Sequence, residues 1–386
     1  ATTITAPPVS LIGAGDIGRC GLPFAEETGL ILDRYPDATI FTTGDNAYVK
    51  GTPTEFAECY DPGWGRHRAR TRPSAGNHDY DTPGAAGYYA YFGDLAGNPS
   101  EGWYGYDLGS WRIMSLNSNC RDVRGCHSGS RQLEWLRTEL AANAGRTCML
   151  AYWHHPRFST GRHGNDDRTE AFWRLLHRYG VDVVLAGHDH DYERLAPLGP
   201  TGALDFEHGI RSFVVGTGGT GLRPFDIPAA EATEIRQATD HGVLLLRLGD
   251  GGYAWEFHGV DGATFADAGS DECVDPSNRV PSVVVASPTD GAVVGPATEL
   301  TLAAVASDPE DGDVTPAITW WSSRDGVIGH GSPLTTSALS LGTHVVTALA
   351  VDAHGVQASS SVTVVVAPNP GAGFDRTIER RVGSSN

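Results

Sequence analysis

Short apolar runs alternate with amphipathic stretches over residues 1–270, and each run stops at a glycine or a polar residue. Val9–Ala14, Ala38–Thr43 and Val181–Ala186 have the length and the turn-residue borders of buried strands. Other segments place apolar residues at helical spacing, as Leu133, Leu136 and Leu140 do. The remaining predicted strands are Cys148–Trp153, Ile210–Val215 and Val243–Leu248, and the predicted helices are Phe24–Arg34, Ser130–Ala144 and Thr169–Tyr179. The alternation predicts a unit that mixes helices and strands.

The pattern changes near residue 275, where segments rich in Val, Thr and Ser replace the mixed pattern. Turn signals such as Asp311-Gly312 and Asp325-Gly326 separate the predicted strands there. These strands are Val283–Ala286, Glu299–Ser307, Ala317–Ser322, Gly342–Asp352 and Ser359–Ala367. We therefore expect a first domain over residues 1–270, a linker over 271–282, an all-β sandwich of immunoglobulin-like size over 283–367, and a tail over 368–386.

The chain is strongly acidic, with 28 Lys and Arg residues against 47 Asp and Glu residues and a formal net charge of −19. Lys50 is its only lysine. Nucleic acids and anionic membranes bind basic surfaces, so this charge balance argues against both as partners. No apolar run approaches the roughly 18 residues of a membrane-spanning helix.

Six cysteines are scattered along the chain without a CxxC pair, which argues against a thiolate zinc site. An even number of scattered cysteines indicates disulfides in a secreted protein, and numbering from Ala1 fits a removed signal peptide. Cys120 and Cys126 are close enough in sequence to close one loop. Among about 15 connectivities of six cysteines, we favour Cys20–Cys59 and Cys148–Cys273 for the other four.

Five short polar motifs follow or end apolar stretches in the first domain, and most contain glycine. They are Gly15-Asp16-Ile17-Gly18, Gly44-Asp45-Asn46-Ala47-Tyr48, Gly76-Asn77-His78-Asp79, Ala151-Tyr152-Trp153-His154 and Gly187-His188-Asp189-His190. Glycine allows the tight turns that bring such loops to a common point. The motifs supply carboxylates, imidazoles, one carboxamide and one phenol, which are ligands for hard or borderline cations. Each motif alone is weak, because Asp in a glycine-rich turn is ordinary turn chemistry.

In this order, the motifs resemble those of the calcineurin-like metallophosphoesterases over residues 9–260. Tyr48, three residues after Asp45, is similar to the tyrosine of the purple acid phosphatase branch. Two positions depart from that branch's pattern: Ala151 stands where it has Val, and Asp79 where many members have Glu. The resemblance implies an α+β fold, a four-layer αββα sandwich with metals at strand ends between its two sheets.

The resemblance also implies two adjacent metal ions bridged by Asp45. The implied Fe³⁺ site consists of Asp16, Asp45, Tyr48 and His190. The implied site for a divalent ion (Zn²⁺, Mn²⁺ or Fe²⁺) consists of Asp45, Asn77, His154 and His188. The chemistry implied is hydrolysis of phosphate monoesters by in-line attack of a metal-bound hydroxide.

Five further residues receive predicted roles beside the metals. His78 is expected to hydrogen-bond the phosphate or to protonate the leaving group, and Asp79 is expected to orient His78. The resemblance makes His163 a substrate contact, while a surface-loop histidine between Gly161 and Gly164 is an equally good interpretation. We expect Asp189 to support its loop, and His155 to be structural rather than a ligand.

Two other functions remain open at this stage. A phosphodiesterase acting on a phospholipid headgroup or a nucleotide would use the same metals, and a non-catalytic binding or adhesion protein is the third hypothesis. The second domain resembles bacterial immunoglobulin-like repeats of secreted enzymes through Ser307–Gly312, Trp320 and Gly342-Thr343-His344. We therefore expect a secreted, extracellular protein that acts on phosphate esters, with this domain providing association with a cell wall or surface.

Overall fold

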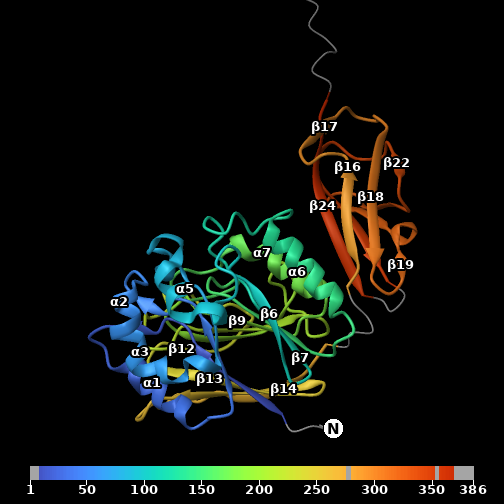
Figure 1. Cartoon of the computed structure of the whole chain (residues 1–386). Coiled ribbons are helices and arrows are strands. Elements are labelled where there is room, and N and C mark those ends of the chain that lie inside the picture. The colour runs from blue at the N-terminus through green and yellow to red at the C-terminus, as the bar shows by residue number, and fades with distance from the viewer. Residues whose placement is uncertain (1–7, 275–279, 353–355, 369–386) are drawn as a thin grey trace, which may run out of the picture. The chain divides into compact units, whose positions relative to one another are not determined.

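The computed structural model describes residues 8–274, 280–352 and 356–368. The chain divides into two compact units, residues 1–279 and 280–386 (Figure 1). Among the described residues, no helix combines the length and the apolar character needed to cross a membrane.

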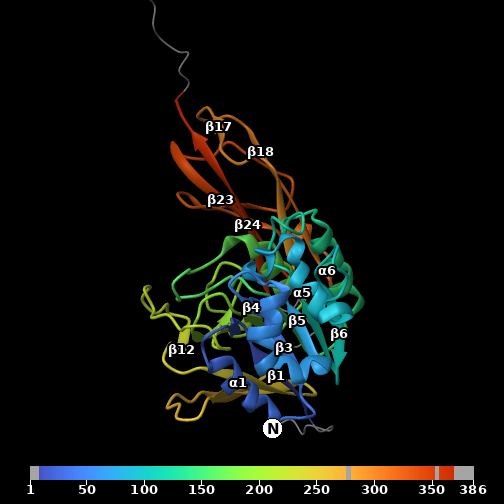
Figure 2. The same cartoon turned by 60° about the vertical axis from the view of Figure 1, so that its left-hand side comes forward.

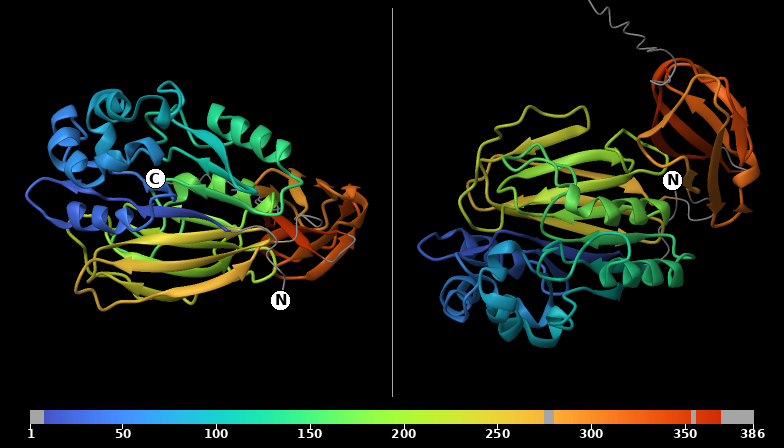
Figure 3. Two further views of the ribbon diagram at one scale, coloured as in Figure 1. Left: turned by 60° about the horizontal axis from the view of Figure 1, so that its bottom comes forward. Right: turned by 90° about the horizontal axis from the view of Figure 1, so that it is seen from above.

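The first unit contains two large sheets (Figures 1 and 3). One has six strands in the order β15 (Ala268–Glu272), β14 (Gly252–Gly259), β13 (Gly242–Gly249), β1 (Val9–Ala14), β3 (Thr39–Thr43) and β5 (Thr71–Ser74). The other has seven strands in the order β12 (Thr233–Gln237), β10 (Tyr192–Leu198), β11 (Ile210–Val215), β9 (Val183–Ala186), β8 (Met149–Tyr152), β7 (Trp111–Ser115) and β6 (Tyr104–Leu108). Strands β1, β3 and β5 are parallel to one another, and so are β7, β8, β9 and β11.

Side-chain alternation along the strands of the seven-stranded sheet separates two apolar cores. In β8, Leu150 and Tyr152 join the core shared with the six-stranded sheet. Met149 and Ala151 point the other way and join a core with the apolar faces of α6 (Arg131–Ala142) and α7 (Glu170–Arg178). Helix α1 (Phe24–Asp33) contributes its buried side chains to the first core and contacts β13 (Figure 2). The predicted metallophosphoesterase-like sandwich of two sheets with outer helices is confirmed.

Shorter elements complete the first unit. They are β2 (Gly18–Arg19), β4 (Ala47–Tyr48), α2 (Pro53–Glu55), α3 (Asp61–Trp64), α4 (Asn77–Tyr80) and α5 (Ala86–Phe92). The predicted cap of the helix over 130–144 is present, because the Ser130 hydroxyl accepts the Leu133 N–H.

Three disulfides join Cys20 to Cys59, Cys120 to Cys126 and Cys148 to Cys273, which are the pairings that we favoured. The predicted linker over 271–282 begins too early, since Asp271 and Glu272 pair with β14 as the end of β15. The next residue, Cys273, is bonded to Cys148, which directly precedes β8. Strand β15 lies at an edge of its sheet, where strands commonly carry charged side chains. Its acidic sequence therefore resembles that of a linker and not that of a buried strand.

The second unit is all-β over its described residues. One sheet has the order β16 (Ser282–Ser287), β18 (Leu300–Asp308) and β19 (Gly312–Asp313), with β22 (Leu334–Thr336) also paired to β18. The other has the order β17 (Ala292–Val294), β24 (Gln357–Val366), β23 (Gly342–Val351), β20 (Thr319–Ser322) and β21 (Gly326–His330). Trp320 is fully buried in their core. The expected all-β class is confirmed, and the immunoglobulin-like assignment stays a prediction; of the predicted tail, residues 369–386 lie outside the described part.

Candidate metal centre

The predicted ligands lie on loops at the carboxyl ends of five parallel strands, three in one sheet and two in the other. Such strand ends are where α/β sheets usually hold their ligands. Asp16 follows β1, Asp45 follows β3, Asn77 follows β5, His154 follows β8, and His188 and His190 follow β9; Tyr48 ends β4, close behind Asp45.

Three of these residues have left-handed backbone conformations. The φ angles are 60° at Asp16, 50° at Asp45 and 70° at His188. Residues other than glycine rarely adopt this conformation, and it concentrates at functional sites. Two glycines beside these residues permit the close approach of the loops. A Cβ at Gly76 would lie 2.1 Å from Asp45 Oδ1, and a Cβ at Gly216 would lie 1.9 Å from the Asp189 carbonyl oxygen.

The first predicted ligand set converges on a common point. Tyr48 Oη lies 2.6 Å from Asp16 Oδ1, 2.9 Å from Asp45 Oδ2 and 3.3 Å from His190 Nε2. His190 Nε2 lies 3.4 Å from Asp16 Oδ1. All four side chains are almost completely buried.

The second predicted set converges beside the first. His154 Nε2 lies 3.1 Å from Asn77 Oδ1, 3.2 Å from His188 Nδ1 and 3.4 Å from Asp45 Oδ2. Ligand atoms about 2.1 Å from one cation are separated by about 3 to 3.4 Å. The distances of the second set lie in this range. In the first set Tyr48 Oη lies closer to the two carboxylates, at 2.6 and 2.9 Å. The same atom of Asp45, Oδ2, belongs to both sets.

Hydrogen bonds on the outer side of each ligand fix which atoms face inward. His154 Nδ1 donates to the Thr43 carbonyl oxygen at 2.8 Å, and His190 Nδ1 donates to the Gly221 carbonyl oxygen at 2.9 Å. A neutral imidazole that donates from Nδ1 has a lone pair at Nε2. In the neutral form of each ring, which is the form that binds a metal, this lone pair points at oxygen atoms of the centre. A cation stabilises such an arrangement, and metal-binding histidines commonly show it.

The two aspartates are oriented in the same way by backbone groups. Asp16 Oδ2 accepts the His188 N–H, and Asp45 Oδ1 accepts the His78 N–H, both at 2.8 Å. The remaining oxygen of each carboxylate points inward. The donor set contains only oxygen and nitrogen atoms, which fits hard or borderline cations. A separate cluster of Cys148, Asp182 and Cys273 does not fit one, because its two sulfurs are bonded to each other.

Burial dominates the electrostatics of these groups. It raises the pKa of Asp16 to about 7 and, together with the charges of Asp16 and Asp45, raises the pKa of Tyr48 well above that of an ordinary phenol. Burial, followed by the charge of Arg223, lowers the pKa of His190 to about 4. For His154 burial acts downward, but the charge and hydrogen bond of Asp45 prevail and raise its pKa to about 9. The charge of Asp45 thus favours a positive group beside it, which is where a cation would bind.

His78 lies at the edge of the metal centre, but Asp79 does not orient it. His78 Nδ1 donates to the Val49 carbonyl oxygen at 2.6 Å, and Nε2 lies 3.9 Å from Asp45 Oδ2. The predicted role of Asp79 is wrong: its buried carboxylate accepts N–H groups of Asn46 and Gly76 instead. Successive residues of α4 point about 100° apart, so His78 and Asp79 face different neighbours.

His163 lies against the second ligand set. Its ring stacks on the His188 ring at 4.2 Å, and its Nδ1 donates to Asp189 Oδ1 at 2.8 Å. Asp189 also accepts the Ser159 hydroxyl, so it links the loop of His163 to the loop of the ligands. His155 is buried beside His188, with Nδ1 2.8 Å from the Ser118 hydroxyl.

Residues 216–223 were missed by the sequence interpretation and form one wall of the centre. This glycine-rich loop follows β11, and its carbonyl at Gly221 holds His190 while the Arg223 side chain reaches His163. The available signal was a predicted strand followed by Gly216-Thr217-Gly218-Gly219-Thr220-Gly221. Tyr192 and Arg194, by contrast, turn away from the centre and bind Asp267.

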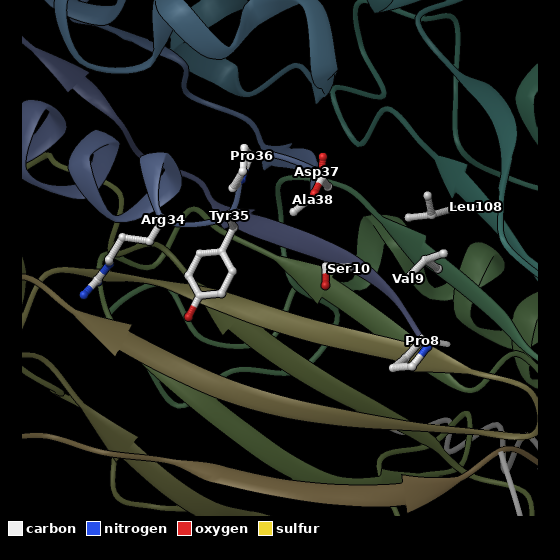
Figure 4. Close-up of a pocket in the computed structure, with 9 residues that line it drawn as sticks. All are labelled: Pro8, Val9, Ser10, Arg34, Tyr35, Pro36, Asp37, Ala38 and Leu108. Atoms are coloured by element: carbon white, nitrogen blue, oxygen red, sulfur yellow. The ribbon is translucent and has the colours of Figure 1, made fainter. Parts of the chain in front are cut away.

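A separate cavity of about 390 Å³ lies at the opposite, amino ends of β1 and β3 (Figure 4). Its lining includes Val9, Ser10, Arg34, Tyr35 and Asp37. None of the predicted site residues lines it, so it is distinct from the metal centre.

Residues 14–192 match the family model of the calcineurin-like phosphoesterases, and they form a calcineurin-like phosphoesterase domain. Within that class, the chain is similar to purple acid phosphatases. Purple acid phosphatase 18 of Arabidopsis thaliana is 26% identical over 262 residues, which are 62% of this chain and 57% of the relative. An uncharacterised protein of Mycobacterium tuberculosis is 30% identical over 245 residues, 52% of this chain and 45% of the relative. The chain thus spans about half the length of these curated relatives.

A solved structure supports the same fold. The purple acid phosphatase from yellow lupin (Lupinus luteus) seeds superposes with a TM-score of 0.57 at 19% identity, over 69% of this chain and 54% of that one. At this identity the likeness concerns the fold alone.

Proposed function

We propose that the protein is a secreted, metal-dependent phosphatase that hydrolyses phosphate monoesters. One observation carries this proposal: the two converging ligand sets share the atom Asp45 Oδ2. Because the Nδ1 atoms of His154 and His190 donate outward, their Nε2 atoms face the carboxylates of Asp45 and Asp16. The match to the calcineurin-like phosphoesterases and the similarity to purple acid phosphatases support the class of reaction.

Two metal ions fit the two ligand sets. Asp16, Asp45, Tyr48 and His190 would hold Fe³⁺, for which a phenolate oxygen is a suitable ligand; Asp45, Asn77, His154 and His188 would hold Zn²⁺, Mn²⁺ or Fe²⁺. When bound, two such ions supply Lewis acidity that polarises the phosphate ester and acidifies water.

His78 is the residue best placed to handle a proton in this reaction. The Val49 carbonyl fixes its Nδ1–H, so its Nε2 is the nitrogen that remains on the side of Asp45. The side chain is 26% exposed, which leaves Nε2 accessible to a substrate. A protonated Nε2 would donate to the leaving-group oxygen. His163, held between His188 and Asp189, would contribute a second contact to the phosphate through Nε2, in the form of the ring that carries a proton on both nitrogens.

We also propose that the protein is located outside the cytoplasm. Three disulfides favour an oxidising compartment. The all-β second unit would associate the enzyme with a cell wall or surface.

The competing functions are separable in one experiment. We would assay the protein, loaded with iron and zinc, on 4-nitrophenyl phosphate and on bis(4-nitrophenyl) phosphate across a pH series. Dominant turnover of the monoester supports the proposal, and dominant turnover of the diester would make the protein a phosphodiesterase. No turnover of either ester, with both metals bound, would favour the binding protein.

A further inference from the structure

The loop that follows β11 fixes one arginine at the rim of the metal centre. Its backbone is hydrogen-bonded to both ligand loops: Thr220 N–H donates to the Asp16 carbonyl at 2.8 Å, and Arg223 N–H donates to the His190 carbonyl at 3.0 Å. Arg223 is therefore anchored through its own backbone to a predicted metal ligand. Such a position is set by the fold and not by a chance side-chain contact.

The side chain of Arg223 reaches the other ligand-bearing side of the centre. Its Nη1 lies 3.4 Å from His163 Nε2, and the His163 ring stacks on the ring of His188. Since His163 Nδ1 donates to Asp189, Nε2 of a neutral ring accepts this contact. Arg223 thus bridges from the His190 backbone to the outer nitrogen of His163.

The guanidinium of Arg223 forms no ion pair among the residues that the structure describes. Two other arginines of this part of the unit have partners of their own: Arg162 lies 3.7 Å from Asp226, and Arg236 donates to Thr160 and to the Ile227 carbonyl. The chain as a whole is acidic, with a net charge of −19. Arg223 nevertheless places a positive charge, without an acidic partner in the described part of the chain, near the predicted ligands His188 and His190. Arg223 is also only half-buried, so four of its five N–H groups remain for a ligand.

We propose that Arg223 binds a non-bridging oxygen of the substrate phosphate and favours monoesters over diesters, an inference that rests on the proposed function. A guanidinium donates charge-assisted hydrogen bonds to phosphate oxygens, and its fork matches two of them. A monoester near neutral pH carries close to two negative charges, whereas a diester carries one. A permanent positive charge at the rim therefore adds more to the binding of the monoester.

The test compares Arg223→Gln with the matched control Arg162→Gln. Arg162 directly precedes His163, but its side chain is 60% exposed and lies 3.7 Å from Asp226, so this variant removes the same charge from a neighbouring position. For both variants we would measure KM and kcat on the two nitrophenyl esters, the affinity for inorganic phosphate by calorimetry, and bound metal by elemental analysis. In Arg223→Gln we expect KM for the monoester to rise about tenfold and phosphate affinity to fall about tenfold. We expect kcat/KM for the diester to stay within about threefold, and both metals to be retained.

Two results would overturn the role of Arg223. One is an unchanged KM and phosphate affinity in Arg223→Gln; the other is the same loss in Arg162→Gln, which would indicate only a long-range charge effect. A wild-type protein that hydrolyses neither ester would contradict the proposed function alone. Phosphate affinity that still fell in Arg223→Gln, and not in Arg162→Gln, would support the inference even then.

Discussion

In the first unit, polar side chains are buried at the carboxyl ends of the parallel strands and exposed around the amino ends of β1 and β3. At the carboxyl ends, Asp16, Asp45 and His154 are each at most 1% exposed and face other ligand atoms. At the amino ends of β1 and β3, Arg34 and Asp37 remain exposed around an open cavity. There, Tyr35 Oη has a partner of its own, His258 Nε2 at 2.9 Å.

This difference indicates which end of the strands lowers the stability of the fold in order to form a ligand site. Burying charged groups and turning their lone pairs toward one another costs free energy of folding. The three left-handed residues at the carboxyl ends add backbone strain. Around the amino ends of β1 and β3 the same core is built without either cost. The convergence of buried ligand atoms at the carboxyl ends therefore belongs to a binding function and not to the fold.

The largest effect is expected from Asp45→Ala, because one oxygen of Asp45 belongs to both ligand sets. We expect loss of both metals and a fall in kcat/KM of at least about 10³-fold. Elemental analysis and the monoester assay measure the two quantities. Asp37→Ala at the amino ends is the control and should leave both unchanged. Retention of two metals by Asp45→Ala would show that Asp45 does not bridge.

A smaller effect is expected from His78→Ala, which removes the proton donor but no metal ligand. We expect kcat to fall about 10²-fold with both metals retained. A substrate with a better leaving group should lose less, because it needs less help from an acid. His258→Ala is the matched histidine at the amino ends, and its kcat should stay within about twofold of wild type. Equal losses on good and poor leaving groups would contradict the role of an acid.

The fold and the convergence of the predicted ligand residues were predictable because both depend on local sequence. Strand length and turn residues located β1, β3, β8 and β9, and each motif directly follows its strand. Polar loops at the carboxyl ends of parallel strands then meet without further information. Strand β10 was missed, since it carries Glu193 and Arg194 within a segment that starts directly after the last ligand.

The remaining features depend on contacts between distant segments. Asp79 binds Asn46 and not His78, and the choice is made by the way α4 packs on the loop after β3. The position of Arg223 depends on hydrogen bonds to Asp16 and His190, which are more than 30 residues away in sequence. No pattern within either segment encodes such pairings.

Tyr48→Phe tests the assignment of the Fe³⁺ site with a moderate effect on binding. The phenol oxygen lies between Asp16 and Asp45, and a phenolate bound to Fe³⁺ absorbs visible light through charge transfer. We expect the ferric wild type to be coloured, the variant to lose the band, and iron affinity to fall about tenfold. Tyr35→Phe at the amino ends should keep the band. A ferric wild type without any visible band would remove Tyr48 from the ligand set.

The smallest effect is expected at Asp182, a buried carboxylate at the amino end of a parallel strand. Asp182 directly precedes β9 and accepts the N–H groups of Met149 and Val274 at 2.7 and 2.6 Å. Burial raises the pKa of this carboxyl to about 8, although both hydrogen bonds act to lower it. An unfolded Asp titrates near about 3.9, so between these values the unfolded chain releases a proton that the folded chain keeps. The free energy of unfolding therefore falls as pH rises through that window.

Asp182→Asn should remove this contribution, and urea unfolding at a series of pH values measures it. We expect the variant to be less stable than wild type near pH 4, because its amide cannot accept both N–H groups, and the gap to close toward pH 8. Asp37→Asn should keep the wild-type dependence on pH. A gap of constant size would show that Asp182 is ionised in the folded protein throughout. Because Asp182 lies outside both ligand sets, the closing of the gap should be the same with and without added metal ions, which separates a carboxylate buried for the fold from those buried for a ligand.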